Sequence, residues 1–134
     1  MGIETGRFKR SDRLLDSRDF RRVLRRGRRH ADSNVVVFSA PIRENTNKAE
    51  DLTNKLPVGS RIGITASRKV GGAVVRNRFK RRVRAWFRLR RFDFSEDRDV
   101  VVIARRSGAT LSFREIDQSL SRLLGLTSLE TGAI

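Results

Sequence analysis

Apolar residues recur at helical spacing in three segments of the chain. A short stripe follows Ser17, a longer one runs from about Ala73 to Arg90, and the third follows Ser112. Ser17 is a favourable N-cap residue, and Gly27 is placed to end the first helix. Ser112 and Glu115 have the spacing of a capping box, which opens a helix. The inner face of that last helix is expected to comprise Phe113, Ile116, Leu120, Leu123 and Leu124.

Four other segments have the composition of β-strands, because they are rich in β-branched residues or alternate apolar with polar positions. They are residues 28–32, 34–40, 61–66 and 99–104. Together with the helices they give the order αβββαβα in a chain of 134 residues, a length typical of one domain. This order favours an α/β (α+β) single-domain sandwich with a central four-stranded mixed sheet. The domain would span residues 1–134, with a core of about 13–124, a mobile loop at 43–58 and a frayed tail at 127–134.

The charge is large and unevenly distributed. Lys and Arg number 31 against 15 Asp and Glu, which gives a net charge of +16. Between Asp51 and Asp93 there are thirteen basic residues and no acidic one, and the segment Arg7–Arg29 holds eleven more basic residues. Segregation of this kind produces a face of one sign that attracts phosphates. The composition therefore favours a protein that binds nucleic acid.

The residue inventory argues against most enzyme chemistry. The chain has no Cys and no Tyr, and its single histidine, His30, is expected to be a surface or packing residue. Disulfides, thiol nucleophiles and Cys-based zinc sites are excluded, and most general acid–base schemes lack their parts. The apolar runs are too short to span a bilayer, and Met1–Arg10 lacks the core of a signal peptide. A cytoplasmic protein is therefore expected.

The expected helix at 73–90 carries two contrasting faces. Its core stripe comprises Val75, Phe79, Val83, Trp86 and Phe87. The opposite side comprises Asn77, Lys80, Arg81, Arg84, Arg88 and Arg91, and Arg76 and Arg78 flank the stripe. Cations in the first turns oppose the helix dipole, and like charges four residues apart repel each other. Because the helix contains no carboxylate to relieve these costs, we expect a phosphate chain to do so.

Four blocks of the sequence resemble the protein subunit of bacterial ribonuclease P. The segment Ala73–Arg84 is similar to the Arg-Asn-Arg signature of that family, and Arg61–Gly71 resembles the strand and turn that precede it. Ser17–Gly27 resembles the first helix of the family, and Asp99–Arg105 the strand before the last helix. The blocks are collinear from about Arg13 to Leu124. The resemblance implies a fold like that of domain 2 of ribosomal protein S5.

The resemblance also implies a function. The catalyst of this family is an RNA whose bound Mg²⁺ hydrolyses precursor tRNA, and the protein binds that RNA (1:1 expected) and the 5′ leader, broadens substrate use and lowers the Mg²⁺ requirement. It implies no catalytic residue, metal ligand, cofactor or small-molecule substrate in this chain. The residues implied to bind the catalytic RNA are Arg76, Asn77, Arg78, Lys80, Arg81, Arg84 and Arg88. Those implied to line a leader cleft are Phe20, Leu24 and Phe38, with Arg68 and Lys69 nearby and Arg10 and Arg13 as additional basic residues.

Three alternatives remain open on the sequence. A ribosomal protein or an RNA chaperone has the same small, basic, cysteine-free composition. A stand-alone nuclease could use the carboxylates of Glu96, Asp97 and Asp99 to hold a metal, although acidic turns before strands are common. A sequence-specific DNA reader is a third possibility, but neither helix-turn-helix nor zinc-finger spacing is present.

Overall fold

The computed structural model describes residues 12–14, 17–42, 59–94 and 96–126. Its helices are α1 (Ser17–Arg26), α2 (Ala73–Arg90) and α3 (Phe113–Leu124), with the short 3₁₀ helices η3 (Arg91–Asp93) and η4 (Arg106–Gly108). Its strands are β1 (Arg28–Ala31), β2 (Val35–Pro41), β3 (Arg61–Thr65) and β4 (Arg98–Ala104). The order αβββαβα is confirmed. The loop predicted at 43–58 and the tail predicted at 127–134 lie outside the described residues.

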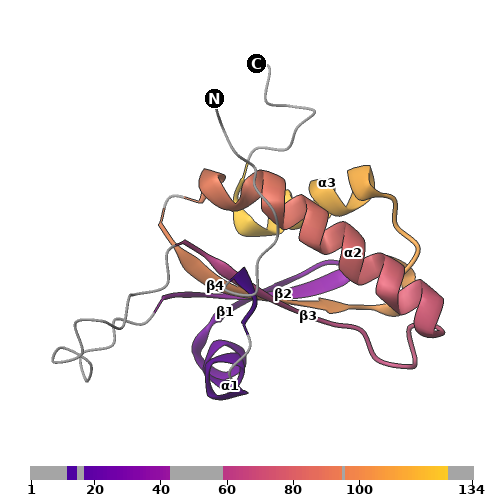
Figure 1. Ribbon diagram of the computed structural model, residues 1–134, viewed down its shortest axis with the longest axis horizontal. Helices are drawn as coiled ribbons and strands as arrows, with labels where there is room; N and C mark the ends of the chain where they lie inside the picture. Colours follow the sequence, from indigo (N-terminus) through magenta and orange to yellow (C-terminus); the bar gives the residue numbers. More distant parts are fainter. Residues whose placement is uncertain (1–11, 15–16, 43–58, 95, 127–134) are drawn as a thin grey trace, which may run out of the picture.

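The strands form one mixed sheet in the order β1-β2-β4-β3. β2 is antiparallel to both β1 and β4, whereas β3 is parallel to β4. Figure 1 shows α1 alone on one face of the sheet and α2 and α3 side by side on the other. The prediction of a sandwich on a mixed four-stranded sheet is therefore confirmed, and β4 lies in the interior of that sheet.

The larger core lies between the sheet and the pair α2 and α3. Phe79, Val83, Trp86 and Phe87 are fully buried there, which confirms most of the predicted core stripe of α2. Val75, in the first turn of α2, is only partly buried. The other members of this core come from the strands and α3: Val35, Val37, Ile62, Ala66, Val100, Val102, Ala104, Ile116 and Leu120. Phe113, Leu123 and Leu124 pack against its edge.

A smaller apolar cluster holds α1 on the opposite face. Its buried members are Leu14, Val23, Ala40 and Val101. Side chains alternate between the two faces along a strand, so Val101 points to α1 while Val100 and Val102 point to α2 and α3. Burying an aliphatic side chain contributes roughly 1.5–3 kcal/mol. A four-residue cluster is therefore a modest anchor for α1.

The start of α1 differs from the sequence prediction, whereas its end agrees with it. The helix begins at Ser17 itself, so Ser17 is its first residue and not its N-cap. Gly27 ends the helix as expected, with its N–H donating to the carbonyl of Val23 at 2.8 Å, but its φ is not positive. A Cβ at Gly27 would lie 2.5 Å from the Val23 carbonyl oxygen and 3.0 Å from that of Ser39. Glycine is required because a Cβ would collide first with the Val23 carbonyl of α1 and then with the Ser39 carbonyl of β2, not because of a left-handed conformation.

A buried polar network joins α2 to α3. The Arg90 guanidinium donates to Asp117 from Nε at 3.0 Å and to Asp93 from Nη1 at 2.9 Å. Ser121 donates to Asp117 at 3.1 Å and accepts from the indole N–H of Trp86 at 3.3 Å. Each buried polar group therefore has a partner, which satisfies the requirement for burying them.

Candidate nucleic-acid interface

α2 presents its basic residues on the side away from the core. It starts after the Gly71-Gly72 turn, as predicted, and the first turn contains no acidic residue. Asn77, Arg78 and Arg81 are exposed. Arg76, Lys80, Arg84 and Arg88 are half-buried beside them. The predicted signature residues therefore share the outer part of one helix.

This outer part of α2 holds positive charge at close spacing. Within the described part of the chain, Arg78, Lys80 and Arg81 form no salt bridge. Partial burial, together with the positive charges of Arg13 and Arg81, lowers the pKa of Arg84 below its ordinary value. Arginine stays protonated despite such a shift. The lowered pKa of Arg84 therefore reports the partial burial of its guanidinium first and the neighbouring charges of Arg13 and Arg81 second, and an incoming anion would offset both.

The same side of α2 also exposes apolar side chains, which the sequence reasoning missed. Val74 and Leu89 are 69% and 45% exposed, and Phe92, in η3, is 70% exposed. Leu89 forms a hollow of about 270 Å³ with Ala85, Arg88 and Phe113. Val74 lies four residues before Arg78, and Phe92 lies three residues after Leu89. This helical spacing was the feature of the sequence that could have placed these apolar side chains on the outer side of α2.

Arg91 was predicted on the basic side of α2, and this prediction is wrong. Its Nη1 atom lies 2.6 Å from the carboxylate of Asp12, and its side chain is 11% exposed. The guanidinium carbon lies 5.8 Å from the ring centroid of Phe87 and 5.4 Å from that of Phe92. Asp12 precedes α1 and is far from Arg91 along the chain, so no local pattern indicated this pairing.

On the other face of the sheet, α1 brings together three predicted residues. Phe20 and Leu24 of α1 and Phe38 of β2 pack in one partly buried cluster with Ile103. Gly63 of β3 makes room for Phe20, because a Cβ at Gly63 would lie 2.7 Å from Cε2 of the Phe20 ring. Phe20, Leu24 and Phe38, here called the α1-side surface, therefore pack against one buried cluster on the same face of the sheet, and their role in a leader cleft stays a prediction.

An ionic cluster fixes α1 above the strands. Asp99 is fully buried and accepts from Nε and Nη2 of Arg61, at 2.9 and 2.8 Å, and from Nη2 of Arg22 at 2.5 Å. Asp19 of α1 lies 3.4 Å from Arg61. Burial alone would lower the pKa of Arg61, but the hydrogen bond and charge of Asp99, followed by Asp19, raise it above its ordinary value.

The same cluster removes the basis of the stand-alone nuclease. Asp99 is engaged by two arginines, whereas Glu96 and Asp97 are exposed. In residues 12–14, 17–42, 59–94 and 96–126, no group of three or more His, Cys, Asp or Glu side chains is arranged to hold a metal ion. The three carboxylates proposed for that alternative therefore do not form one site.

Arg13 links the two candidate surfaces. It is exposed and forms a parallel bridge with Ile62 of β3, which is an edge strand. Its charge acts on Arg84 of α2. Arg13 and Leu14 therefore lie along the edge of the sheet between the α1-side surface and α2.

The other predicted basic residues are less closely placed. Arg68 and Lys69 are exposed in the turn after β3, where Val70 N–H donates to the Ser67 carbonyl at 3.0 Å. They follow the carboxyl end of β3 and precede α2. Arg10 lies outside the described residues.

Comparison with known proteins decides the family. The model of the ribonuclease P family matches residues 8–127, which is nearly the whole chain. This chain belongs to that family. Among curated relatives, the ribonuclease P protein component of Clostridium novyi is 34% identical over 117 residues, covering 87% of this chain and 94% of the relative. That of Desulfosudis oleivorans is 37% identical over 123 residues, covering 92% and 91%.

Solved structures of the ribonuclease P family agree in fold. The RNase P protein of Staphylococcus aureus has a TM-score of 0.66 at 28% identity, covering 85% of this chain and 93% of that one. The RNase P protein of Thermotoga maritima in complex with 1-(4-fluorophenyl)-2-thiourea has a TM-score of 0.66 at 30% identity, covering 84% and 96%. As a ribonuclease P protein, this chain is an RNA-binding protein of tRNA processing, not a ribosomal protein or a DNA reader. None of the helices described is both long and apolar enough to cross a membrane.

Proposed function

We propose that this chain binds the catalytic RNA of ribonuclease P, one protein per RNA, and the 5′ leader of precursor tRNA. The RNA and its Mg²⁺ perform the hydrolysis, and the protein contributes no catalytic residue or metal ligand. The observation that carries this proposal is the outer part of α2, which combines exposed arginines with the absence of any carboxylate in the helix. Family membership supplies the identity of the RNA.

The catalytic RNA binds the outer part of α2. Its phosphates accept from the guanidinium groups of residues such as Arg78 and Arg81, in the forked geometry that favours arginine over lysine. Neutralisation relieves the repulsion of Arg84 by Arg13 and Arg81, which lowers the pKa of Arg84 in addition to its partial burial. Affinity should fall steeply with salt, because each neutralised phosphate releases counterions.

The leader binds the α1-side surface. The rings of Phe20 and Phe38 are only partly buried, so each offers apolar surface against which an unpaired base can pack. Stacking on an aromatic side chain contributes about 1–3 kcal/mol per base and tolerates any sequence. Mature tRNA lacks a leader, so this contact favours the precursor and broadens the range of substrates. Arg13, Arg68 and Lys69 add positive charge at the same edge of the sheet.

The protein also lowers the Mg²⁺ requirement. A net charge of +16 placed between two RNA surfaces screens their mutual repulsion, which Mg²⁺ would otherwise have to do. If added protein leaves the Mg²⁺ midpoint of cleavage unchanged, this screening does not occur.

The test is 5′ cleavage of a precursor tRNA at low Mg²⁺ by the catalytic RNA, with and without this protein. Wild type should stimulate strongly, Arg78→Ala weakly, and protein alone should be inactive. Arg106→Ala is the matched control, since Arg106 is an exposed arginine in η4, away from α2. Phe20→Ala should reduce the preference for precursor over mature tRNA and leave binding of the catalytic RNA intact. Absence of stimulation by wild type, or cleavage by protein alone, would overturn the proposal.

A further inference from the structure

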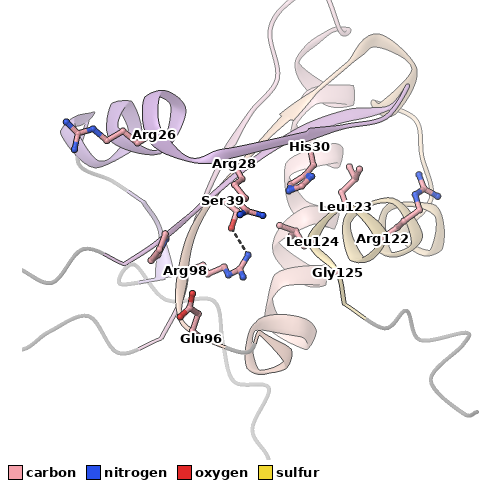
Figure 2. A pocket seen from close by; sticks show the side chains of 11 residues that line it. Arg26, Arg28, His30, Ser39, Glu96, Arg98, Arg122, Leu123, Leu124 and Gly125 are labelled. Atoms are coloured by element: carbon pink, nitrogen blue, oxygen red, sulfur yellow. Dashed lines mark hydrogen bonds between the residues drawn. The ribbon is translucent and has the colours of Figure 1, made fainter.

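A second basic surface lies on the face of the sheet opposite α1. Figure 2 shows a hollow between the carboxyl end of α3 and the strands β1, β2 and β4. Its volume is about 800 Å³. The basic side chains that line it are Arg26, Arg28, His30, Arg98 and Arg122. Glu96 is the one carboxylate among the described residues of the lining.

Two of the four arginines that line the hollow have a protein partner, and the other two have none in the described part of the chain. Arg122 donates to Asp32 at 2.8 Å, and Arg98 donates to Ser39 at 3.1 Å, the dashed line in Figure 2. Arg26 and Arg28 are exposed and form no salt bridge with any described residue. Leu123 and Leu124 give the hollow an apolar wall. Unpaired guanidinium groups beside apolar carbon suit a strand whose phosphates and bases are both accessible.

The hollow continues the α1-side surface around an edge of the sheet. α1 crosses the sheet, because Phe20 lies over Gly63 of β3 while Gly27 packs against Ser39 of β2. Arg26, in the last turn of α1, therefore lies at the rim of the hollow, with its guanidinium directed outward in Figure 2. β1 is the edge strand there, and its residues 28–30 are exposed.

Along β1, side chains alternate between the two surfaces. Arg29 pairs with Phe38 and shares its face, whereas Arg28 pairs with Ser39 and lines the hollow. A chain that leaves Phe38 thus meets Arg29 and then Arg28 as it turns around β1. Protection of a sheet edge needs only a charge or two on the edge strand and does not account for Arg26 and Arg98 around a hollow.

We propose that this hollow binds the leader nucleotides that lie upstream of those held by the α1-side surface. Arg26 and Arg28 contact their phosphates, and the bases pack against Leu123 and Leu124. A duplex would keep its bases stacked inside and could not use that wall, so the ligand is single-stranded RNA. The inference rests on the proposed function, since it extends the same leader beyond Phe38.

The test compares two precursor tRNAs bound by the complete ribonucleoprotein. One has a leader that just covers the α1-side surface, and the other carries an added 5′ oligouridine extension. The extension should tighten binding to wild type, and the double variant Arg26→Gln/Arg28→Gln should lose that gain while keeping its affinity for the short leader. For the long leader, the slope of log K against log salt should fall by about 1.4, at about 0.7 per phosphate on a single strand.

The matched control is Arg105→Gln/Arg106→Gln, which removes the same charge at the other end of β4. It should retain the gain from the extension. Equal losses for both leaders, loss of the gain in the control variant, or no gain with wild type would each overturn the inference. Failure of the proposed function gives a different result, in which wild type does not distinguish the short-leader precursor from mature tRNA and Phe20→Ala changes nothing.

Discussion

The replacement Asp99→Asn tests how α1 is held against the sheet. The carboxylate of Asp99 is fully buried and accepts three charge-assisted hydrogen bonds, two from Arg61 and one from Arg22. Asparagine keeps the shape and one acceptor oxygen but removes the charge. Two guanidinium groups, 14% and 18% exposed, then lose their main counterion.

The expected loss of stability follows from this geometry. Breaking a buried ion pair by removing one partner costs about 3–5 kcal/mol. Asp19 remains 3.4 Å from Arg61 and 3.8 Å from Arg22 and offsets part of the loss. We therefore expect a decrease of about 3 kcal/mol in the free energy of unfolding, a large part of the 5–15 kcal/mol typical of a domain.

Urea unfolding measures this decrease, because urea does not screen charges as a guanidinium salt does. The single tryptophan, Trp86, is buried between α2, α3 and the sheet, so its fluorescence follows the larger core while circular dichroism follows the whole chain. The control is Arg122→Gln, which removes a pair whose arginine is 65% exposed and should cost at most about 1 kcal/mol. If Asp99→Asn costs no more than this control, Asp99 is not the anchor of α1.

Three further changes have defined outcomes. Burial raises the pKa of Asp32, but hydrogen bonds from the backbone N–H of Val35 and Asn34, then Ser119 and Arg122, outweigh it and hold the pKa below 3.8. Wild type should therefore be more stable than Asp32→Asn at pH values above 3.8, and this advantage should vanish as the pH falls through the lower pKa that Asp32 has in the folded state. Urea midpoints of the two proteins that differ equally at all pH values would contradict this. Gly63→Ala should displace the Phe20 ring and weaken precursor binding as Phe20→Ala does with little change in Tm, whereas unchanged binding would show that the ring position does not matter. Ser112→Ala removes the acceptor for the Glu115 N–H at 3.2 Å and should cost about 1 kcal/mol in thermal unfolding. The control is Ser67→Ala, because Ser67 is exposed and its side chain has no hydrogen bond to a described residue.

Local patterns in the sequence were sufficient for most of the elements. The predicted bounds of α2, Ala73 to Arg90, match the structure, and the capping box at Ser112 is present with both hydrogen bonds. The convergence of Phe20, Leu24 and Phe38 was also expected, but from the resemblance to a family. These features depend on neighbouring residues or on a known relative.

Features that depend on distant contacts were not predictable from pattern. Asp99 looks the same in sequence whether it is exposed in an acidic turn or buried between Arg22 and Arg61, which lie 77 and 38 residues away. The helical spacing of Arg91 predicts an exposed side chain on the outer side of α2. In the structure its guanidinium pairs with the carboxylate of Asp12, and its side chain is largely buried. The signal in each case is a partner that only the tertiary fold identifies.

The position of β4 in the sheet bears on how the protein folds during synthesis. Among the strands that the structure describes, β3 pairs only with β4, and β2 has β4 as its second partner, so the sheet cannot assemble before residues 98–104 have left the ribosome. Until then the nascent chain can form little more than the β1–β2 hairpin, which is marginally stable on its own in water. About three-quarters of this strongly basic chain is thus synthesised before its core can form. The larger core therefore forms only when β4 and α3 have both been synthesised.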